Sequence, residues 1–193
     1  MLFRSAPAVQ ALDRPTHLAA RGVTFAYPDG TVALRSLDLT IPRGRKVVVL
    51  GANGCGKSTL FLHFGGVLRP KSGEIVLDGE TVRYDRAGLT RLRQKVGLVF
   101  QDPDSQLFAS SVRQDVSFGP LNLGWTEAKV REAVANAIEA TQISDLADRP
   151  AHLLSYGQKK RVAIAGVLAM DPELIVADEP TAGLDPRSEE HTS

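Results

Sequence analysis

The sequence predicts an α/β fold whose core is interrupted by a mostly helical insert. Short apolar runs typical of strands occur through the first hundred residues and again near residue 175. Between about 102 and 160 the helical pattern dominates. The chain has 193 residues, of which 43% are hydrophobic and 23% are charged. This is enough for one domain with a sizeable core plus an insert. We expect that domain over residues 18–186, with its core at 18–101 and 161–186.

Composition argues against several classes of protein. The net charge is +1 and no Lys/Arg block stands out, so no nucleic-acid surface is expected. The longest nearly apolar run, Val162–Met170, is too short to span a bilayer. A single cysteine, Cys55, excludes an internal disulfide and fits a reducing cytoplasm. Residues 1–17 lack the apolar stretch of a secretory signal, and we expect a disordered extension there.

The first strands are predicted by alternation and turn residues. Residues 18–27 and 32–41 alternate loosely on either side of Pro28-Asp29-Gly30, which predicts two strands of an antiparallel edge sheet. Residues 73–77 and 96–100 are short apolar runs and predict two further strands.

A phosphate-binding loop follows the next apolar run. Lys46–Leu50 is almost continuously apolar, which predicts a strand buried on both faces. Gly51–Ser58 then fits G-x-x-x-x-G-K-[ST], and a helix is expected to follow and to end near Gly65-Gly66. Backbone N–H groups of such a loop turn towards an anion, and the helix start adds its dipole. The alternative interpretation is a glycine-rich turn that binds no ligand.

Within this loop, Lys57 is expected to reach the β- and γ-phosphates, and the hydroxyl of Ser58 is expected to bind Mg²⁺. The candidate phosphate-binding residues are Gly51, Ala52, Asn53, Gly54, Cys55, Gly56, Lys57, Ser58 and Thr59.

The insert contains two clear helix starts. Thr126 can cap a helix that begins at Glu127, and its apolar positions at i, i+4 and i+8 share one face. Those positions are Val130, Val134 and Ile138. A second helix is expected to start beside Ser155, and Gly119-Pro120 predicts a turn.

Two adjacent acids follow the last predicted strand. Leu174–Ala177 is apolar, and Asp178 and Glu179 come directly after it, at the strand end where open α/β sheets bind ligands. Asp178 suits a metal, and Glu179 suits orienting or deprotonating an attacking water. The alternative is a solvated Asp-Glu pair of no function.

Taken in order, these motifs resemble those of the ATP-binding-cassette ATPases over roughly residues 18–186. The resemblance implies a P-loop NTPase (RecA-like) core, with ATP and Mg²⁺ as ligands. It assigns Tyr27 to stacking on adenine, and Gln101 to contact with Mg²⁺ and the attacking water. Asp178 then joins Ser58 and Gln101 as a metal residue, and Glu179 is the base.

The resemblance also implies a dimer. Ser155, Tyr156, Gly157 and Gln158 match the signature motif, which in this family caps the nucleotide of a second ATPase subunit. Asp185 matches a loop that crosses to that subunit. The signature departs from the common LSGGQ because Tyr156 replaces the first glycine, and we expect its side chain to point away from the phosphate.

The segments after Gln101 and around the signature look like those of energy-coupling-factor importers, closest to the cobalt and nickel type. The resemblance implies an ATP-hydrolysing subunit at the cytoplasmic face of the membrane. Its partners would be transmembrane importer subunits, one of which docks a helix on the segment after Gln101. Two alternatives stay open: a soluble cassette acting on ribosomes or nucleic acid, and a non-catalytic cassette.

The end of the chain departs from the family. A switch histidine is expected about thirty residues beyond the acids, whereas the sequence stops at Ser193. Residues 187–193 (RSEEHTS) match one frame of a widely used sequencing adapter, so a non-native tail is expected there. The last strands and helices of the fold would then be missing, and this chain would hydrolyse ATP very slowly.

Overall fold

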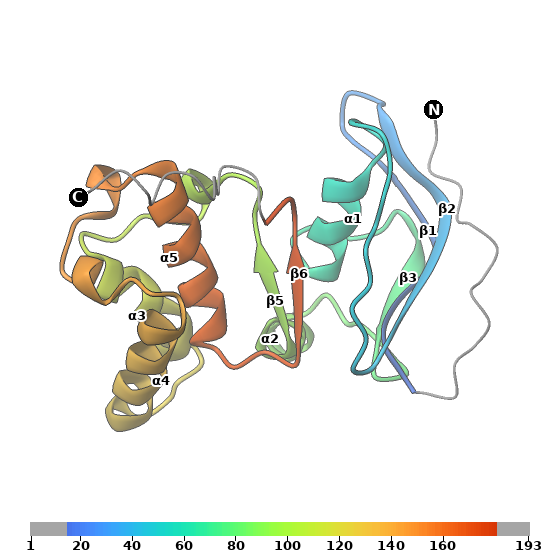
Figure 1. The fold of residues 1–193 in the computed structure, drawn as a ribbon. Coiled ribbons are helices and arrows are strands. Elements are labelled where there is room, and N and C mark those ends of the chain that lie inside the picture. Colours follow the sequence, from blue (N-terminus) through green and yellow to red (C-terminus); the bar gives the residue numbers. More distant parts are fainter. Residues whose placement is uncertain (1–14, 181–193) are drawn as a thin grey trace. The chain divides into compact units, whose positions relative to one another are not determined.

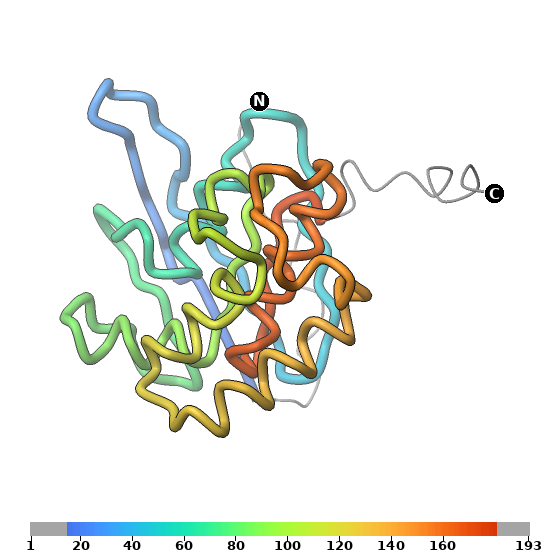
Figure 2. Tube along the Cα trace, turned by 90° about the vertical axis from the view of Figure 1, so that its left-hand side faces the viewer, coloured from blue at the N-terminus to red at the C-terminus, as the bar shows by residue number. Residues whose placement is uncertain are grey.

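The computed structural model describes residues 15–180, in two compact units divided between Arg93 and Gln94 (Figures 1 and 2). The candidate dimer-loop residue Asp185, the tail 187–193 and most of the expected N-terminal extension lie outside the described residues. The predicted division into a core (18–101 and 161–186) and a helical insert (about 102–160) stays a prediction.

Unit 1 is built on a four-stranded antiparallel sheet in the order β2-β1-β3-β4. Its strands are β1 (Thr16–Ala26), β2 (Val32–Pro42), β3 (Ser72–Leu77) and β4 (Glu80–Thr81). The two strands predicted around the Pro28 turn and the strand at 73–77 are therefore confirmed. β1 begins at Thr16, so the last two residues of the expected extension belong to the sheet.

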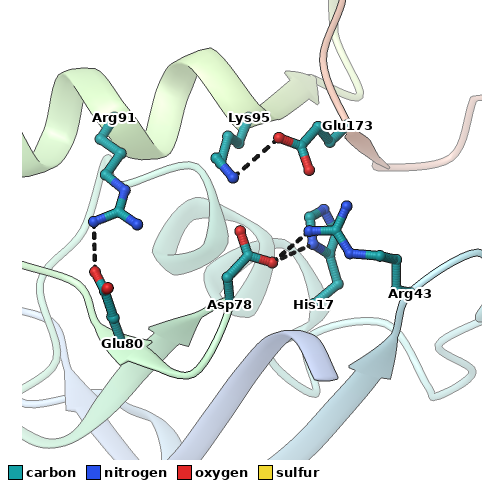
Figure 3. A network of polar contacts seen from close by, with 7 residues as sticks. All are labelled: His17, Arg43, Asp78, Glu80, Arg91, Lys95 and Glu173. Atoms are coloured by element: carbon teal, nitrogen blue, oxygen red, sulfur yellow. Dashed lines mark hydrogen bonds and ion pairs between the residues drawn. The ribbon is translucent and has the colours of Figure 1, made fainter. Parts of the chain in front are cut away.

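Polar side chains tie one end of this sheet together (Figure 3). Asp78, in the β3–β4 turn, accepts from Arg43 at 2.7 Å and lies 2.8 Å from Nδ1 of the buried His17 on β1. Arg91 pairs with Glu80 in the same unit. In unit 2, Lys95 pairs with Glu173 at 3.0 Å. These contacts join chain segments that are distant in sequence.

Two helices complete unit 1. α1 (Lys57–Phe64) follows the phosphate loop and ends at Gly65, as predicted, with Leu60, His63 and Phe64 buried. α2 (Arg86–Lys95) belongs to unit 1 except for its last two residues, Gln94 and Lys95. It buries Leu92, and its charged composition gave no periodic signal that would have predicted it.

The predicted strand at Lys46–Leu50 is wrong. Residues 45–50 have no regular secondary structure, and Val47, Val48 and Leu50 are 41%, 77% and 80% exposed. A strand needs a hydrogen-bonded neighbour, and no strand of residues 15–180 pairs with this segment. Its apolar composition indicates a buried strand, but composition cannot supply that neighbour.

Unit 2 joins a parallel strand pair to a helical cluster. β5 (Val96–Val99) pairs with β6 (Leu174–Ala177), which confirms both predicted strands. The helices are α3 (Val112–Asn122), α4 (Glu127–Ala140) and α5 (Tyr156–Leu168), grouped together in yellow to orange in Figures 1 and 2. A short 3-10 turn, η1 (Pro103–Ser105), lies between β5 and α3, and two more, η2 (Ser144–Leu146) and η3 (Ala151–Leu153), connect α4 to α5.

The helical cluster has its own apolar core. It contains the predicted stripe of α4, and the Thr126 hydroxyl accepts from the N–H of Lys129, which confirms the predicted cap. The turn predicted at Gly119-Pro120 is wrong, because α3 continues through Pro120 to Asn122. Pro120 has no N–H to give to the carbonyl of Val116, so α3 loses that one backbone bond and continues for only two more residues. None of the helices described is long and apolar enough to cross a bilayer.

Candidate functional site

The phosphate loop places unpaired N–H groups at the start of α1. Gly56 is the N-cap, with φ of 103°, and it has no side chain to accept from the first turn. The first bond of the helix runs from the N–H of Leu60 to the carbonyl of Gly56. The N–H groups of Lys57, Ser58 and Thr59 therefore lack helical acceptors and are suited to an anion.

Lys57 adds a positive charge to this loop. Its ammonium donates to the carbonyls of Gly51 at 2.8 Å and Ala52 at 3.0 Å, so the side chain folds back across the loop. These are acceptors that a phosphate oxygen could replace. The Sγ of the buried Cys55 lies 4.0 Å from the same ammonium.

Tyr27 is tied to the phosphate helix. Its hydroxyl and that of the buried Thr59 are 2.9 Å apart, and its ring meets Phe25 edge-on with centroids 5.2 Å apart. The structure thus brings the predicted adenine residue to α1, while the stacking role itself stays a prediction. Ser58, the predicted metal residue of this unit, is exposed.

His63 is a residue of this region that the sequence analysis missed. It is fully buried in α1, with Nδ1 2.7 Å from the carbonyl of Thr59 and its ring edge-on to Phe25. Burial lowers its pKa, although backbone contacts partly oppose the shift. A histidine between apolar residues in Phe61-Leu62-His63-Phe64 was the available signal, since the polar ring must follow its neighbours inward.

In unit 2, strand pairing brings the acids to Gln101. β5 and β6 run parallel, with Val99 opposite Ala177, so the residues after both strands leave the sheet at the same edge. The side-chain N–H₂ of Gln101 donates to Oε2 of Glu179 at 2.9 Å. Asp178 is buried, and its N–H donates to the carbonyl of Val99 at 3.1 Å.

Glu179 has an unusual backbone conformation. Its φ is +46°, in the left-handed region that most residues avoid, and its side chain is exposed. Strain of this kind persists where the surrounding structure enforces it, and it is frequent at functional sites. The main chain here turns the carboxylate towards Gln101.

The signature motif forms the start of α5. Ser155 is the N-cap, its hydroxyl accepts from the N–H of Gln158, and the Gln158 side chain accepts from the N–H of Ser155 in a capping box. The hydroxyl of Tyr156 donates to the carbonyl of Gln101 at 3.0 Å. Gly157, in the same first turn, leaves the surface beside them free of a side chain. The Tyr156 side chain is therefore bonded to the segment of its own chain that carries Gln101. That it points away from a bound phosphate stays a prediction.

Lys160 was also missed. It is fully buried, and its ammonium donates to the carbonyls of Phe100 at 3.1 Å and Gln101 at 2.8 Å. Burial lowers its pKa, while nearby carboxylates, led by Asp178, act in the opposite direction. A lysine in a run of three basic residues looks like a solvated face, so no local signal marks it.

The predicted residues thus form two groups. Unit 1 holds Tyr27 and the phosphate loop with Ser58; unit 2 holds Gln101, Asp178, Glu179 and the signature. The three predicted metal residues offer a hydroxyl, an amide oxygen and a carboxylate. Such hard oxygen donors fit Mg²⁺ and not a metal that prefers sulfur or imidazole.

Known proteins share this chain's sequence and fold. A family model described as ABC transporter matches residues 34–182. An energy-coupling factor transporter ATP-binding protein, EcfA of Methanothermobacter thermautotrophicus, is 55% identical over 87% of this chain and 54% of its own length. The cobalt import ATP-binding protein CbiO of Rhodobacter capsulatus is 56% identical over 87% of this chain and 60% of its length. The chain therefore spans little more than half of each.

Two solved structures of ATP-binding cassettes are similar to this chain in fold. The cbiO1 structure from Clostridium perfringens, part of the ABC transporter complex cbiONQ, has a TM-score of 0.77 and 51% identity, covering 90% of this chain and 69% of its own. A dimeric post-hydrolysis structure of the ATP-binding cassette MJ0796, bound to ADP and phosphate, has a TM-score of 0.79 and 29% identity, covering 88% and 76% of the two chains. These likenesses confirm the predicted P-loop NTPase fold. The chain belongs to the ATP-binding-cassette (ABC) transporter family.

Proposed function

We propose that this chain binds and hydrolyses ATP as the nucleotide-binding part of an energy-coupling-factor importer. The observation that carries the proposal is the contact between Gln101 and Glu179 at the ends of two parallel strands. It presents an amide and a carboxylate at one edge of a sheet, in a chain that also holds a phosphate loop. Hydrolysis of a phosphate bond needs a group that orients the attacking water, and a carboxylate beside that group can accept the proton of the water.

Each residue group has a defined task in this proposal. N–H groups of the loop at Gly51–Thr59 bind the phosphates of ATP, and Lys57 exchanges its two carbonyl acceptors for phosphate oxygens. Tyr27 stacks on the adenine. Glu179 accepts a proton from the attacking water, which Gln101 helps to orient.

A bound Mg²⁺ would be held by Ser58, Gln101 and Asp178, and it would neutralise charge that develops on the phosphates. Oxygen donors in these three side chains support this assignment.

A second ATPase subunit completes the site in our proposal. The capping box at Ser155 satisfies the N–H of Gln158 and leaves the N–H groups of Tyr156 and Gly157, in the first turn of α5, without helical acceptors, so they can bind the γ-phosphate held by another subunit. Tyr156, Gly157 and Gln158 belong to that turn, and Asp185 would contact the same partner. The MJ0796 cassette, which shares the fold, was solved as a dimer.

An exposed aromatic pair on unit 2 supports docking of a membrane subunit. Phe108 and Phe118 are 66% and 50% exposed and meet edge-on with centroids 4.7 Å apart. Leu121, one helical turn after Phe118, is 57% exposed. Oδ1 of the buried Asp115 accepts from the N–H groups of Phe108 and Ala109, both at 3.0 Å, and holds this loop in place. In our proposal the partner is an apolar helix of a transmembrane importer subunit, and the chain would then lie at the cytoplasmic face of the membrane.

Cobalt or nickel is the cargo we favour, because a relative that is 56% identical is a cobalt import protein by name. The alternative of a soluble cassette acting on ribosomes or nucleic acid is not favoured by any of the relatives described above.

The deciding experiment is the substitution Glu179→Gln. Binding of ATP should persist, because the loop is untouched, while phosphate release should fall by roughly 10²- to 10⁴-fold. Glu139→Gln, an exposed glutamate on α4, is the matched control and should release phosphate at the unmodified rate. Equal and measurable rates for Glu179→Gln and the control would refute the assignment of the base.

A further inference from the structure

Side chains from the first turns of α5 converge on the main chain after β5. The carbonyl oxygen of Gln101 accepts from the hydroxyl of Tyr156 at 3.0 Å and from the ammonium of Lys160 at 2.8 Å. A carbonyl oxygen has two lone pairs, so both are used. The ammonium of Lys159, one residue before Lys160, pairs with Asp104 at 2.7 Å.

The side chain of Gln101 makes a further hydrogen bond. The amide of Gln101 donates to the carboxylate of Glu179 at 2.9 Å. Holding the carbonyl of Gln101 restricts rotation of the peptide plane, and this plane helps to set the direction in which the side chain leaves the backbone. Two hydrogen bonds, one to the carbonyl of Gln101 and one from its side chain, thus link the second residue of the signature motif to Glu179.

Both donors have features that a simple helix start does not require. A glycine, as in LSGGQ, has no side chain to reach Gln101, whereas the phenol of Tyr156 does so although its residue is 42% exposed. Burying an ammonium is costly unless it is hydrogen-bonded, and Lys160 is fully buried with two main-chain carbonyls as acceptors. The two carbonyls, of Phe100 and Gln101, explain why a lysine is tolerated there.

We propose that Tyr156 and Lys160 are positioning residues that hold Gln101 against Glu179, so that the start of α5 sets the geometry of the acid pair in its own chain. This inference rests on the proposed function, in which the same helix start binds the nucleotide of a second subunit. Binding of the second subunit's nucleotide by the start of α5 would then affect how Gln101 and Glu179 orient water at the nucleotide bound by their own chain. Neither side chain touches substrate in this scheme; the Tyr156 hydroxyl and the Lys160 ammonium both act through Gln101.

The first test needs no activity. In the ¹⁵N-labelled chain, the side-chain amide signal of Gln101 is identified by its loss in Gln101→Ala, and Glu179→Ala shows where it moves when the contact is broken. Tyr156→Phe and Lys160→Met should each move it in that direction. Lys159→Met removes an ammonium from the same helix turn but leaves the carbonyl of Gln101 bonded, so it is the control and should leave the signal in place.

The second test separates positioning from mere structural support. Tyr156→Phe should lower kcat about three- to tenfold, the effect of losing one hydrogen bond, with little change in ATP binding without Mg²⁺. In a Gln101→Ala background the same substitution should change kcat by less than about twofold, because the side chain it positions is gone. A purely structural role would lower kcat equally in both backgrounds.

The outcomes distinguish the two proposals. Absence of ATP binding by the unmodified chain counts against the proposed function, and the amide signal then decides the inference alone. The inference is overturned if Tyr156→Phe and Lys160→Met leave that signal at its original position. It is also overturned if the effects of Tyr156→Phe and Gln101→Ala on kcat multiply independently. Tyr156→Phe removes one exposed hydroxyl, so it keeps the test valid should Lys160→Met fail to fold.

Discussion

Replacing Gly56 by alanine is a direct measure of how strongly the phosphate loop depends on its backbone shape. Gly56 has φ of +103°, which residues with a side chain rarely adopt. A Cβ placed there would lie 2.6 Å from the carbonyl oxygen of Ala33 and 3.1 Å from Cδ2 of Leu34. The first neighbour is main chain of β2 and cannot turn aside.

Two costs add at this position. The positive φ costs an alanine about 1–3 kcal/mol. Forcing a methyl group against packed atoms costs about 1–3 kcal/mol more. We therefore expect the free energy of unfolding of Gly56→Ala to fall by roughly 2–6 kcal/mol, the sum of the two. Gly54 is the matched control, because its φ is +76° but nothing lies within 4 Å of an added Cβ.

The assay is urea unfolding of both variants, followed by ATP binding at a concentration where each is folded. Gly54→Ala should lose only the first cost, so Gly56→Ala should be less stable by about 1–3 kcal/mol. ATP binding should weaken more in Gly56→Ala, because relief of the contact with Ala33 moves the N–H groups at the start of α1. Equal stabilities for the two variants would refute the reasoning from the close approach.

Three further predictions concern other parts of the chain. Burial lowers the pKa of His63 below 6.5, so as pH falls through and below that value the unfolded chain binds a proton that the folded chain does not. Tm should therefore drop between about pH 7 and 5, and it should drop by less in His63→Leu. Ser155→Ala removes an N-cap and should lower the free energy of unfolding by about 0.5–2 kcal/mol, as Thr126→Ala should at α4, with urea unfolding as the measurement. Phe118→Asp should weaken co-purification with the membrane subunits by about tenfold or more while ATP binding persists, and the exposed Val67→Asp in unit 1 should leave both unchanged.

Features with a local signal were predictable from the sequence. The phosphate loop is identified by the spacing of its glycines and Lys57, and the helix that follows ends at the expected glycine pair. Thr126 and Ser155 cap their helices because the acceptor and its donor N–H lie three residues apart, within one short segment. The acids after β6 follow from an apolar run and its abrupt end.

Features that depend on distant partners were not predictable. Lys160 and Tyr156 bond to a carbonyl 59 and 55 residues away, and no pattern around either residue indicates which carbonyl that is. The contact between Gln101 and Glu179 spans 78 residues and requires the parallel register of β5 and β6. The run Lys46–Leu50 failed in the opposite way, since its composition indicates a strand for which residues 15–180 offer no neighbour.

That same run has a practical consequence for anyone handling the protein. Val47, Val48 and Leu50 present β-branched and leucine side chains to water, in a segment that pairs with no strand among residues 15–180 and carries charge only at its start. Segments of high β-propensity and low charge are prone to pair with copies of themselves. Concentrated solutions of this chain should therefore gain β-structure and scatter light with time, and Val48→Lys should delay both without touching the phosphate loop. Purification at low protein concentration is the corresponding precaution.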